Sequence, residues 1–496
     1  MERRGFLVAG LGALAAACSD EPRRPGASAP ARKSSAPPSA APTGPADWNA
    51  LERGLEGRLV RPGDAAYGQA RRLYIPRFDR VRPAGIAYCA NPQDVAECMA
   101  FAARRDLPVA VRCGGHNYAG WSTGTGLVVD VSAMDGIEAE RGRAVVGAGV
   151  RLIDLYDRLG EAGALVPAGT CPTVGVAGLT LGGGLGALSR AYGLTCDRLE
   201  SVQVVTPDGR VRECDARRDP ELFWACRGGG GGNFGVATSL VLRTERTGDL
   251  YEFSVRWPWS RAADVLRGWQ RWAPDAPPET WSSLQINSGP ADLEVSGVAL
   301  ADPGREIERL AGRVGGGDPE TGVRRRGHVA TMKLLAGCPD RSVEECHAPG
   351  RLPGQRPGGR YPRTEYAAKS HIAYRDLTDD AIETLVGRFA GPQGRSVLID
   401  AMGGAIGRTG PGDTAFPHRT ARFCLQYIAY GGANRAWLHD VHQAMEPYVR
   451  GAAYVNYMDP GLKDWRRAYY GPNLDRLARA KAAYDPAGRL RFPQGL

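Results

Sequence analysis

Apolar and polar positions change period several times along this chain, and each period predicts a different kind of element. Residues 85–88 and 109–112 are short apolar runs typical of strands. Residues 92–105, between them, carry apolar side chains at helical spacing behind Pro92. The folded part is therefore expected to begin with a β-α-β unit. Similar runs predict strands at 127–130, 144–147, 199–206, 211–214 and 236–242, and helices over 152–159 and near 219–226.

The pattern changes after residue 245, where the strands become longer and most of the tryptophans occur. Strands are expected at 251–257, 281–287, 293–300, 397–402 and 423–430, mixed with helices. This is the α+β pattern of a sheet that helices cover on one side. The tail returns to helices after a short strand at 453–457. We therefore predict an α+β fold of two domains: residues 47–245 completed by a C-terminal segment, 440–496, and an inserted domain, 246–439.

The first 46 residues do not show the pattern of a folded domain. Residues 1–18 are typical of an export signal, because Arg3 and Arg4 form a twin-arginine pair before an apolar run, 7–17. That run is too short for a membrane span, which needs about 20 residues. It ends at Cys18, which is expected either to carry a lipid anchor or to mark a simple cleavage site. Residues 19–46 are a Pro/Ala/Ser-rich linker, so we predict an exported protein, whether periplasmic, membrane-anchored or secreted.

The charge distribution argues against a nucleic-acid partner. The formal net charge is +9 over 496 residues, but residues 1–46 carry six positive and three negative charges, which leaves +6 on the remainder. These charges are spread along the chain without the dense basic stripe that binds nucleic acid.

Eleven cysteines in an exported chain favour disulfide bonds. Cys338 and Cys346 are the best pair, because both fall in a loop-like region that contains Pro and Gly. His347 adjoins the pair, but two sulfurs and one imidazole lack the fourth ligand of a structural zinc site. We therefore expect a Cys338–Cys346 disulfide and no metal.

Two glycine-containing turns carry the candidate chemistry. Each presents one nucleophile, the imidazole of His116 or the thiol of Cys171, where backbone can closely approach a flat or phosphorylated ligand. Such a pair suggests a cofactor held by two covalent bonds, although each residue alone is more typical of a structural histidine or an inert thiol. The glycine run 182–186 is an imperfect dinucleotide fingerprint without a clear β-α-β setting, and no glycine run continues into a P-loop.

Six ordered motifs give the chain a specific resemblance over residues 65–496. They comprise Arg112-x-Gly-Gly-His116-x-Tyr118, Gly169-x-Cys171-x-x-Val174-Gly175-x-x-Gly178, Leu181-Gly-Gly-Gly-x-Gly186, residues 219–229, Asn233-Phe234-Gly235 and C-terminal segments at 454–457, 470–473 and 484–494. On these motifs the chain resembles the berberine-bridge-enzyme-like flavin oxidases. That family has the PCMH-type FAD-binding fold of the vanillyl-alcohol oxidase superfamily.

The resemblance implies that residues 47–245 and 440–496 bind FAD, and that the inserted antiparallel-sheet domain binds substrate. His116 would bond the flavin 8α carbon and Cys171 the flavin C6, which suits their nucleophilic character and would make the flavin a stronger oxidant. Glycines in the motifs would let backbone N–H groups approach the pyrophosphate. The other implied cofactor-binding residues are Arg112, Gly114, Gly115, Asn117, Thr173, Val174, Gly175, Gly178, Gly182, Gly183, Gly184, Gly193, Leu194, Asp197 and Asn456.

A base must take the hydroxyl proton of the substrate while the flavin accepts a hydride at N5. A tyrosinate can serve if a cation or hydrogen-bond donors lower its pKa from about 10. On a strand at 453–457, Tyr454 and Asn456 would share one face and Tyr457 the other, so only one tyrosine would face the flavin. The resemblance favours Tyr457 over Tyr454. It also implies a substrate side lined by Tyr118, Tyr192 and Gln426.

We therefore expect an exported FAD-dependent oxidase that acts on a small molecule and dioxygen. It would take a hydride from an alcohol or hemiacetal carbon of a sugar or natural product and reduce dioxygen to hydrogen peroxide. The compact Val174, at a position where the resembled family varies the space near flavin C4a, favours access of dioxygen. The alternatives are an FAD-dependent dehydrogenase, an oxidative cyclase of secondary metabolism, and a flavin-carrying binding protein without turnover.

Overall fold

A computed structural model describes residues 45–288, 292–389 and 391–496. The predicted export signal with Cys18, and nearly all of the predicted linker, lie outside these residues. Within the described ranges, no helix has the length and hydropathy that crossing a membrane requires.

Short strands and helices alternate up to residue 246. The strands are β1 (Arg58–Val60), β2 (Gly85–Tyr88), β3 (Val109–Arg112), β4 (Leu127–Asp130), β5 (Ile137–Glu140), β6 (Arg143–Gly147), β7 (Ala164–Leu165), β8 (Leu199–Val205), β9 (Val211–Cys214), β10 (Val236–Arg243) and β11 (Glu245–Arg246). The helices are α1 (Pro45–Gly54), α2 (Tyr67–Ala70), α3 (Pro92–Arg105), α4 (Leu152–Glu161), α5 (Val176–Leu181), α6 (Ser189–Tyr192) and α7 (Pro220–Ala225).

Longer strands follow, as the sequence pattern predicts. They are β12 (Asp249–Pro258), β13 (Thr280–Asn287), β14 (Asp292–Ala299), β15 (Glu320–Gly327), β16 (Tyr366–Ala373), β17 (Arg395–Ala401) and β18 (Phe423–Tyr430). The helices of this part and of the tail are α8 (Ala262–Trp272), α9 (Gly304–Val314), α10 (His328–Leu335), α11 (Asp379–Gly387), α12 (Arg435–Met445), α13 (Trp465–Tyr470) and α14 (Leu474–Tyr484).

Besides the two-stranded pair of β7 and β11, the first half of the chain builds two small sheets. One has the strand order β1-β2-β4-β3, with β2, β4 and β3 parallel, and the other is antiparallel with the order β5-β6-β10-β8-β9. The predicted β-α-β start is confirmed, since α3 lies between β2 and β3 in the chain. Because β3 is an edge strand, the turn that follows it lies at the margin of its sheet.

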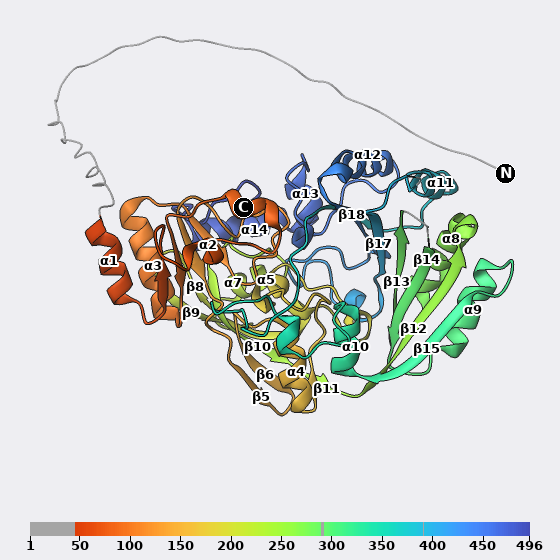
Figure 1. Cartoon of the computed structure of the whole chain (residues 1–496), viewed down its shortest axis with the longest axis horizontal. Coiled ribbons are helices and arrows are strands. Elements are labelled where there is room, and N and C mark those ends of the chain that lie inside the picture. Colours follow the sequence, from red (N-terminus) through yellow and green to blue (C-terminus); the bar gives the residue numbers. More distant parts are fainter. Residues whose placement is uncertain (1–44, 289–291, 390) are drawn as a thin grey trace, which may run out of the picture. The chain divides into compact units, whose positions relative to one another are not determined.

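A seven-stranded antiparallel sheet, in the order β15-β12-β14-β13-β17-β18-β16, lies wholly within residues 246–439. Helices α8, α9, α11 and α12 pack together over one of its faces (Figure 1). Side-chain alternation separates the two faces: Leu425 and Tyr427 of β18 join the apolar cluster beneath these helices, whereas Gln426 points the other way. Helix α12 crosses residue 440 and packs on β16 and β18, so it belongs with this sheet rather than with the C-terminal segment.

The predicted strand at 453–457 is wrong. Residues Val455–Tyr457 form a 3₁₀ helix, and the Tyr457 amide donates to the Tyr454 carbonyl at 2.9 Å to close the turn. The two-residue alternation expected for this segment therefore does not apply. Two strands of the seven-stranded sheet also escaped prediction, because β15 is an exposed, arginine-rich edge and β16 is built largely from small and polar residues. The short strands β1, β5, β7 and β11 were missed as well.

The two turns that carry the predicted nucleophiles pack backbone against backbone. A Cβ built on Gly114 would lie 2.4 Å from the amide nitrogen of Gly175, and one built on Gly175 would lie 1.9 Å from the sulfur of Cys113. The start of α4 supports the second turn, because the Leu152 amide donates to the Val174 carbonyl at 3.0 Å. Only glycine fits at both contact positions.

We expect Gly175→Ala to lower the free energy of unfolding by about 1–3 kcal/mol or more, because the added methyl group overlaps neighbouring atoms. Gly312→Ala, in the last turn of α9 with no atom within 4 Å of its Cβ, is the matched control and should leave stability unchanged or raise it by up to about 1 kcal/mol. Urea denaturation of both variants measures the difference. Equal stability of the two would contradict the close backbone contact.

Candidate active site

His116 lies in the glycine turn after β3 and contacts two neighbours, one aromatic and one polar. Its ring stacks on Tyr74, with 4.0 Å between ring centroids and 19° between planes, and its Nε2 lies 2.8 Å from Thr173 Oγ1. Burial and the nearby Arg151 guanidinium lower the pKa of His116 to about 3. The imidazole is therefore neutral at physiological pH, which leaves a nitrogen lone pair available as a nucleophile.

Cys171 lies beside the same threonine. Burial raises the pKa of its thiol to about 11, against hydrogen bonds from Thr173 and from the Tyr361 hydroxyl that lower the pKa. The thiol is thus protonated at neutral pH and has to lose its proton when the sulfur reacts. Thr173 contacts both His116 and Cys171, so the structure brings the two predicted nucleophiles to one place.

A cavity of about 410 Å³ is lined along its length by β3 and by the turn that carries His116. The first turn of α5, residues 231–232, the 3₁₀ helix Val455–Tyr457 and the chain end at 491–493 complete its wall. A Cβ built on Gly178 would meet no atom within 4 Å, so any side chain there would occupy the cavity itself. The predicted site residues on the wall are Gly114, Gly115, His116, Asn117, Tyr118, Val174, Gly175, Gly178, Asn456 and Tyr457.

This cavity fits the cofactor that the motifs imply. An extended strand four residues long spans about 13 Å, which gives an elongated ligand a continuous wall that ends in the turn of His116. Glycine at 178 lets a ligand approach the backbone there without a side chain between them. The cavity can therefore hold a ring system beside His116 and a phosphorylated tail along β3.

The glycine run 182–184 does not face this cavity, in contrast to the prediction. A Cβ on Gly182 would lie 2.0 Å from the side-chain oxygen of Asn456, and the Gly184 amide donates to the Tyr454 hydroxyl at 2.9 Å. Gly183 likewise uses its amide internally, donating to the Thr180 carbonyl at 3.0 Å. Residues 182–184 therefore pack around side chains of the 3₁₀ segment, and their N–H groups are not available to bind a pyrophosphate.

Several other predicted site residues also lie off the cavity wall. The carboxylate of Asp197 accepts hydrogen bonds from both Arg419 terminal nitrogens at 2.7 Å and from the Leu194 amide at 2.9 Å, beside Gly193. The Arg112 guanidinium pairs with Asp130 inside the protein. These ion pairs stabilise the loops around the site rather than contact a ligand. Tyr192 packs in a separate apolar cluster with Leu188 and Trp281.

Tyr454 and Tyr457 have different surroundings. The Tyr454 hydroxyl accepts hydrogen bonds from the amides of Gly184 and Leu185 and from Asn456 Nδ2, at 2.9, 3.2 and 2.9 Å. The Tyr457 ring instead lies on the cavity wall. Tyr457 is therefore the tyrosine that faces a ligand, as the resemblance favours, although the strand geometry offered for it was wrong.

Tyr118 joins the cavity to the large sheet. Its ring stacks on Tyr457 with 5.3 Å between centroids and 6° between planes, and meets Tyr366 edge-on at 5.2 Å. Gln426 Nε2 donates to the Tyr118 hydroxyl at 2.7 Å. The structure thus brings Tyr118 and Gln426 together as predicted, and it adds Tyr366, which lies on the unrecognised strand β16.

The protonation states of this cluster differ from the expectation of an activated tyrosinate. Burial raises the pKa of Tyr454 to about 12 and that of Tyr457 well above its ordinary value, with no cation among the causes. Asp400, on β17 opposite Cys424, lies close enough to Tyr457 to influence its titration, and burial raises its own pKa to about 6. The sequence analysis did not identify Asp400. The available signal was the presence of a carboxylate within the otherwise apolar run 397–402.

Three side chains behind the large sheet are near enough to bind a metal ion in principle. They are His371, His442 and Glu446, whose ligand atoms lie within 4.8 Å of one another. The two imidazoles stack at 4.0 Å with 14° between planes, so their in-plane lone pairs do not converge on one point. His371 Nε2 is already hydrogen-bonded to Glu446 at 2.9 Å. We assign this cluster a structural role.

Comparison with known proteins identifies the cofactor class. A family described as "FAD binding domain" matches residues 83–215, which carry both nucleophile turns, and a family described as "Berberine and berberine like" matches residues 453–496. The fold and the site therefore define an FAD-linked oxidoreductase.

Relatives over nearly the full length narrow this class to a family. FAD-linked oxidoreductase YgaK of Bacillus subtilis (strain 168) is 32% identical over 462 residues, which cover 89% of this chain and 97% of the relative. Chitooligosaccharide oxidase of Gibberella zeae is 26% identical, over 86% of this chain and 89% of its own. The solved structure of BBE-like 1 from Physcomitrella patens superposes with a TM-score of 0.82 at 26% identity, over 90% and 98% of the two chains. The chain belongs to the berberine bridge enzyme-like family of FAD-linked oxidoreductases.

We expect Tyr454→Phe to lower the free energy of unfolding by about 2 kcal/mol, because three buried donors lose their shared acceptor. Tyr457→Phe serves as the control, since its hydroxyl has no comparable set of buried donors among the described contacts, and it should change stability by less than about 1 kcal/mol. Thermal denaturation of the two variants tests this difference. A larger loss in Tyr457→Phe would refute the assignment of Tyr454 as the structural tyrosine.

Proposed function

We propose that this FAD-linked oxidoreductase is an oxidase that acts on an alcohol or hemiacetal carbon of a sugar-like substrate and produces hydrogen peroxide. The observation that carries the proposal is the meeting of two features on the cavity wall, a neutral His116 and the stacked tyrosines 118 and 457. Cys171 lies two residues before Thr173, which is hydrogen-bonded to His116. The similarity to a chitooligosaccharide oxidase supports a carbohydrate as substrate.

His116 and Cys171 are proposed to hold the cofactor by two covalent bonds. The His116 lone pair is available because burial keeps the ring neutral, and Thr173 orients that ring through the hydrogen bond to Nε2. Cys171 precedes the same threonine by two residues, so Thr173 connects the turn of Cys171 to the imidazole. When bound, FAD supplies the acceptor for the substrate hydride and passes the two electrons to dioxygen.

The substrate is proposed to bind against the aromatic wall formed by Tyr118 and Tyr457. Gln426 donates to the Tyr118 hydroxyl at 2.7 Å, so the large sheet fixes the ring of Tyr118 relative to the cavity. An apolar ring face next to polar hydroxyl and amide groups suits a sugar, which has C–H faces and a hydroxyl rim. Natural-product alcohols that carry similar rings fit the same description.

Asp400 is proposed as the base that takes the hydroxyl proton of the substrate, in place of a tyrosinate. Its pKa of about 6 keeps the carboxylate ionised at neutral pH yet basic enough to accept a proton. Tyr457, with its pKa raised by burial, is protonated and is proposed to orient the substrate as a hydrogen-bond donor. The hydroxyl proton goes to Asp400 while the hydride leaves the carbon that bears this hydroxyl.

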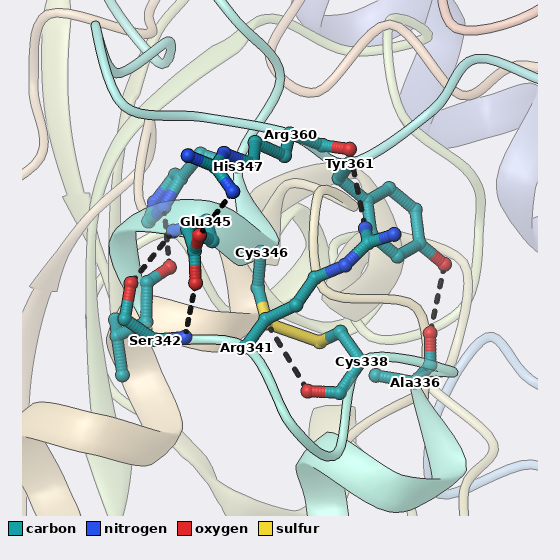
Figure 2. The surroundings of a disulfide bond; sticks show 10 residues. Ala336, Cys338, Arg341, Ser342, Glu345, Cys346, His347, Arg360 and Tyr361 are labelled. Carbon is teal, nitrogen blue, oxygen red and sulfur yellow. Dashed lines mark hydrogen bonds and ion pairs between the residues drawn. A yellow bond between two sulfur atoms is a disulfide. The ribbon is translucent and has the colours of Figure 1, made fainter.

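The compact side chain of Val174 in the cavity wall favours an oxidase over a dehydrogenase. This compact side chain lines the cavity beside the His116 turn and leaves space for dioxygen. Export through the twin-arginine signal at Arg3 and Arg4, with a lipid anchor at Cys18 as one outcome, is also part of the proposal. The disulfide between Cys338 and Cys346 (Figure 2) supports it, because such bonds persist in oxidising compartments.

We expect the flavin to stay with the protein after acid precipitation, and His116→Ala and Cys171→Ala each to retain it through the remaining bond. Only the double variant should release it. Absorbance of the redissolved pellet and mass spectrometry of the flavin peptides measure this. A colourless wild-type pellet would overturn covalent attachment, and release from either single variant would overturn the double bond.

We expect kcat/KM to fall about tenfold per pH unit below about pH 6, because protonated Asp400 cannot accept the substrate proton. Asp400→Asn should lower kcat by about 10²–10⁴-fold and abolish this dependence. Asp380→Asn, an exposed aspartate on α11, is the control and should behave as wild type. Anaerobic flavin bleaching by chitooligosaccharides, followed by peroxide release on adding dioxygen, measures both half-reactions. An unchanged pH profile in Asp400→Asn would exclude it as the base.

A further inference from the structure

Residues 452–459, the part of the tail that contains the ligand-facing tyrosine, run along the edge of the large sheet. Strand β16 is at one end of the strand order, so one side of its backbone is free to bond to other segments. The Ile372 amide donates to the Ala452 carbonyl at 2.9 Å, and the Tyr454 amide donates to the Ser370 hydroxyl at 3.1 Å. The segment is therefore held against β16 up to the start of its 3₁₀ helix.

An ion pair fastens the segment to the same strand beyond the 3₁₀ helix. Lys369 Nζ, on β16, lies 2.5 Å from Asp459 Oδ2, two residues after Tyr457. Both side chains are largely buried, with 12% and 9% of their surfaces exposed. Solvent ions therefore screen this pair little, and each buried charge depends on the other for its stabilisation.

Asp459 is also fixed within the tail. Its second carboxylate oxygen accepts from the Gly461 amide at 2.8 Å, its amide donates to the Tyr469 hydroxyl at 2.9 Å, and its carbonyl accepts from Gln494 Nε2 at 2.7 Å. These three partners belong to the tail, whereas Lys369 belongs to the large sheet. The ion pair therefore transmits the position of the sheet to a rigid part of the tail.

The proposed reaction takes one group from each of these two parts. Asp400, the proposed base, lies on β17 of the sheet, whereas Tyr457, which is proposed to orient the substrate, lies in the tail. Their separation matters, because a displacement of about 1 Å can lower the rate of a catalysed step by about 10²-fold. Tyr457 lies between two points that are fixed to β16, at Tyr454 and at Asp459.

We propose that Lys369 and Asp459 are positioning residues, whose ion pair fixes the distance between Tyr457 and the substrate-facing side of the large sheet. This inference rests on the proposed function, and it identifies the contact that keeps the two proposed catalytic groups in register. Neither residue lines the cavity, so the pair acts through Tyr457 and not on the substrate.

The test separates the rate of the chemical step from binding and from folding. We expect Lys369→Met to lower the limiting rate of anaerobic flavin reduction by chitooligosaccharides about 10–100-fold, while the half-saturating sugar concentration changes less than about threefold. Reoxidation by dioxygen should keep its wild-type rate, since neither member of the pair lines the cavity. Lys369→Arg retains the charge and should recover most of the lost rate. Stopped-flow absorbance of the bound flavin measures these rates.

Glu245→Gln is the matched control. It breaks the Arg198–Glu245 pair, which has the same 2.5 Å separation but does not contact residues 452–459. It should reduce the flavin at the wild-type rate, whatever its effect on thermal stability. Because a single unpaired buried charge can unfold a protein, Lys369→Met with Asp459→Asn, which removes both charges, is the second variant. It should reduce the flavin as slowly as Lys369→Met.

The outcomes separate this inference from the proposed function. A wild-type rate of reduction in Lys369→Met, or in the double variant, would overturn the inference alone. An equal loss of rate in Glu245→Gln, or no recovery in Lys369→Arg, would also overturn it, since the slowing would then reflect general loosening. Wild-type rates in both Asp400→Asn and Tyr457→Phe would overturn the proposed catalytic groups and this inference with them, as would a wild-type protein whose flavin the sugar does not reduce.

Discussion

The candidate site depends on one close contact, that between the backbones of Gly114 and Gly175. Two turns some sixty residues apart in the chain can approach this closely only because neither carries a side chain at the contact. The contact sets the separation of the imidazole and the thiol, and the Thr173 hydroxyl then orients the imidazole. Both glycines also line the cavity, so this part of its wall is fixed by backbone and not by mobile side chains.

The large sheet contributes to the site through simple alternation. Its helix-covered face carries the apolar cluster that stabilises the sheet, which leaves every second residue of β16, β17 and β18 for the opposite face. Tyr366, Asp400 and Gln426 lie on that face. The chemistry of the proposed substrate side can therefore change by substitution at these positions without disturbing the core behind them.

The sequence predicts those features that depend on residues close together in the chain, and it fails for those that depend on distant residues. The β-α-β start, the longer strands after residue 245 and the disulfide follow from local periodicity and composition, and the structure confirms them. The conformation at 453–457 did not follow, because side chains from this segment bond to residues 270 and more positions away. Asp400 was also missed, since only burial by distant strands raises its pKa and makes it a candidate base.

The groups around the proposed attachment site come from the whole length of the chain: Tyr74 before β2, His116 and Cys171 in the first half and Tyr457 in the tail. No partial chain emerging from the ribosome contains this set until synthesis is almost finished. The proposed attachment of the cofactor would thus be confined to molecules that have completed folding. The yellow colour of covalently bound flavin would therefore indicate that the whole chain of that molecule had folded.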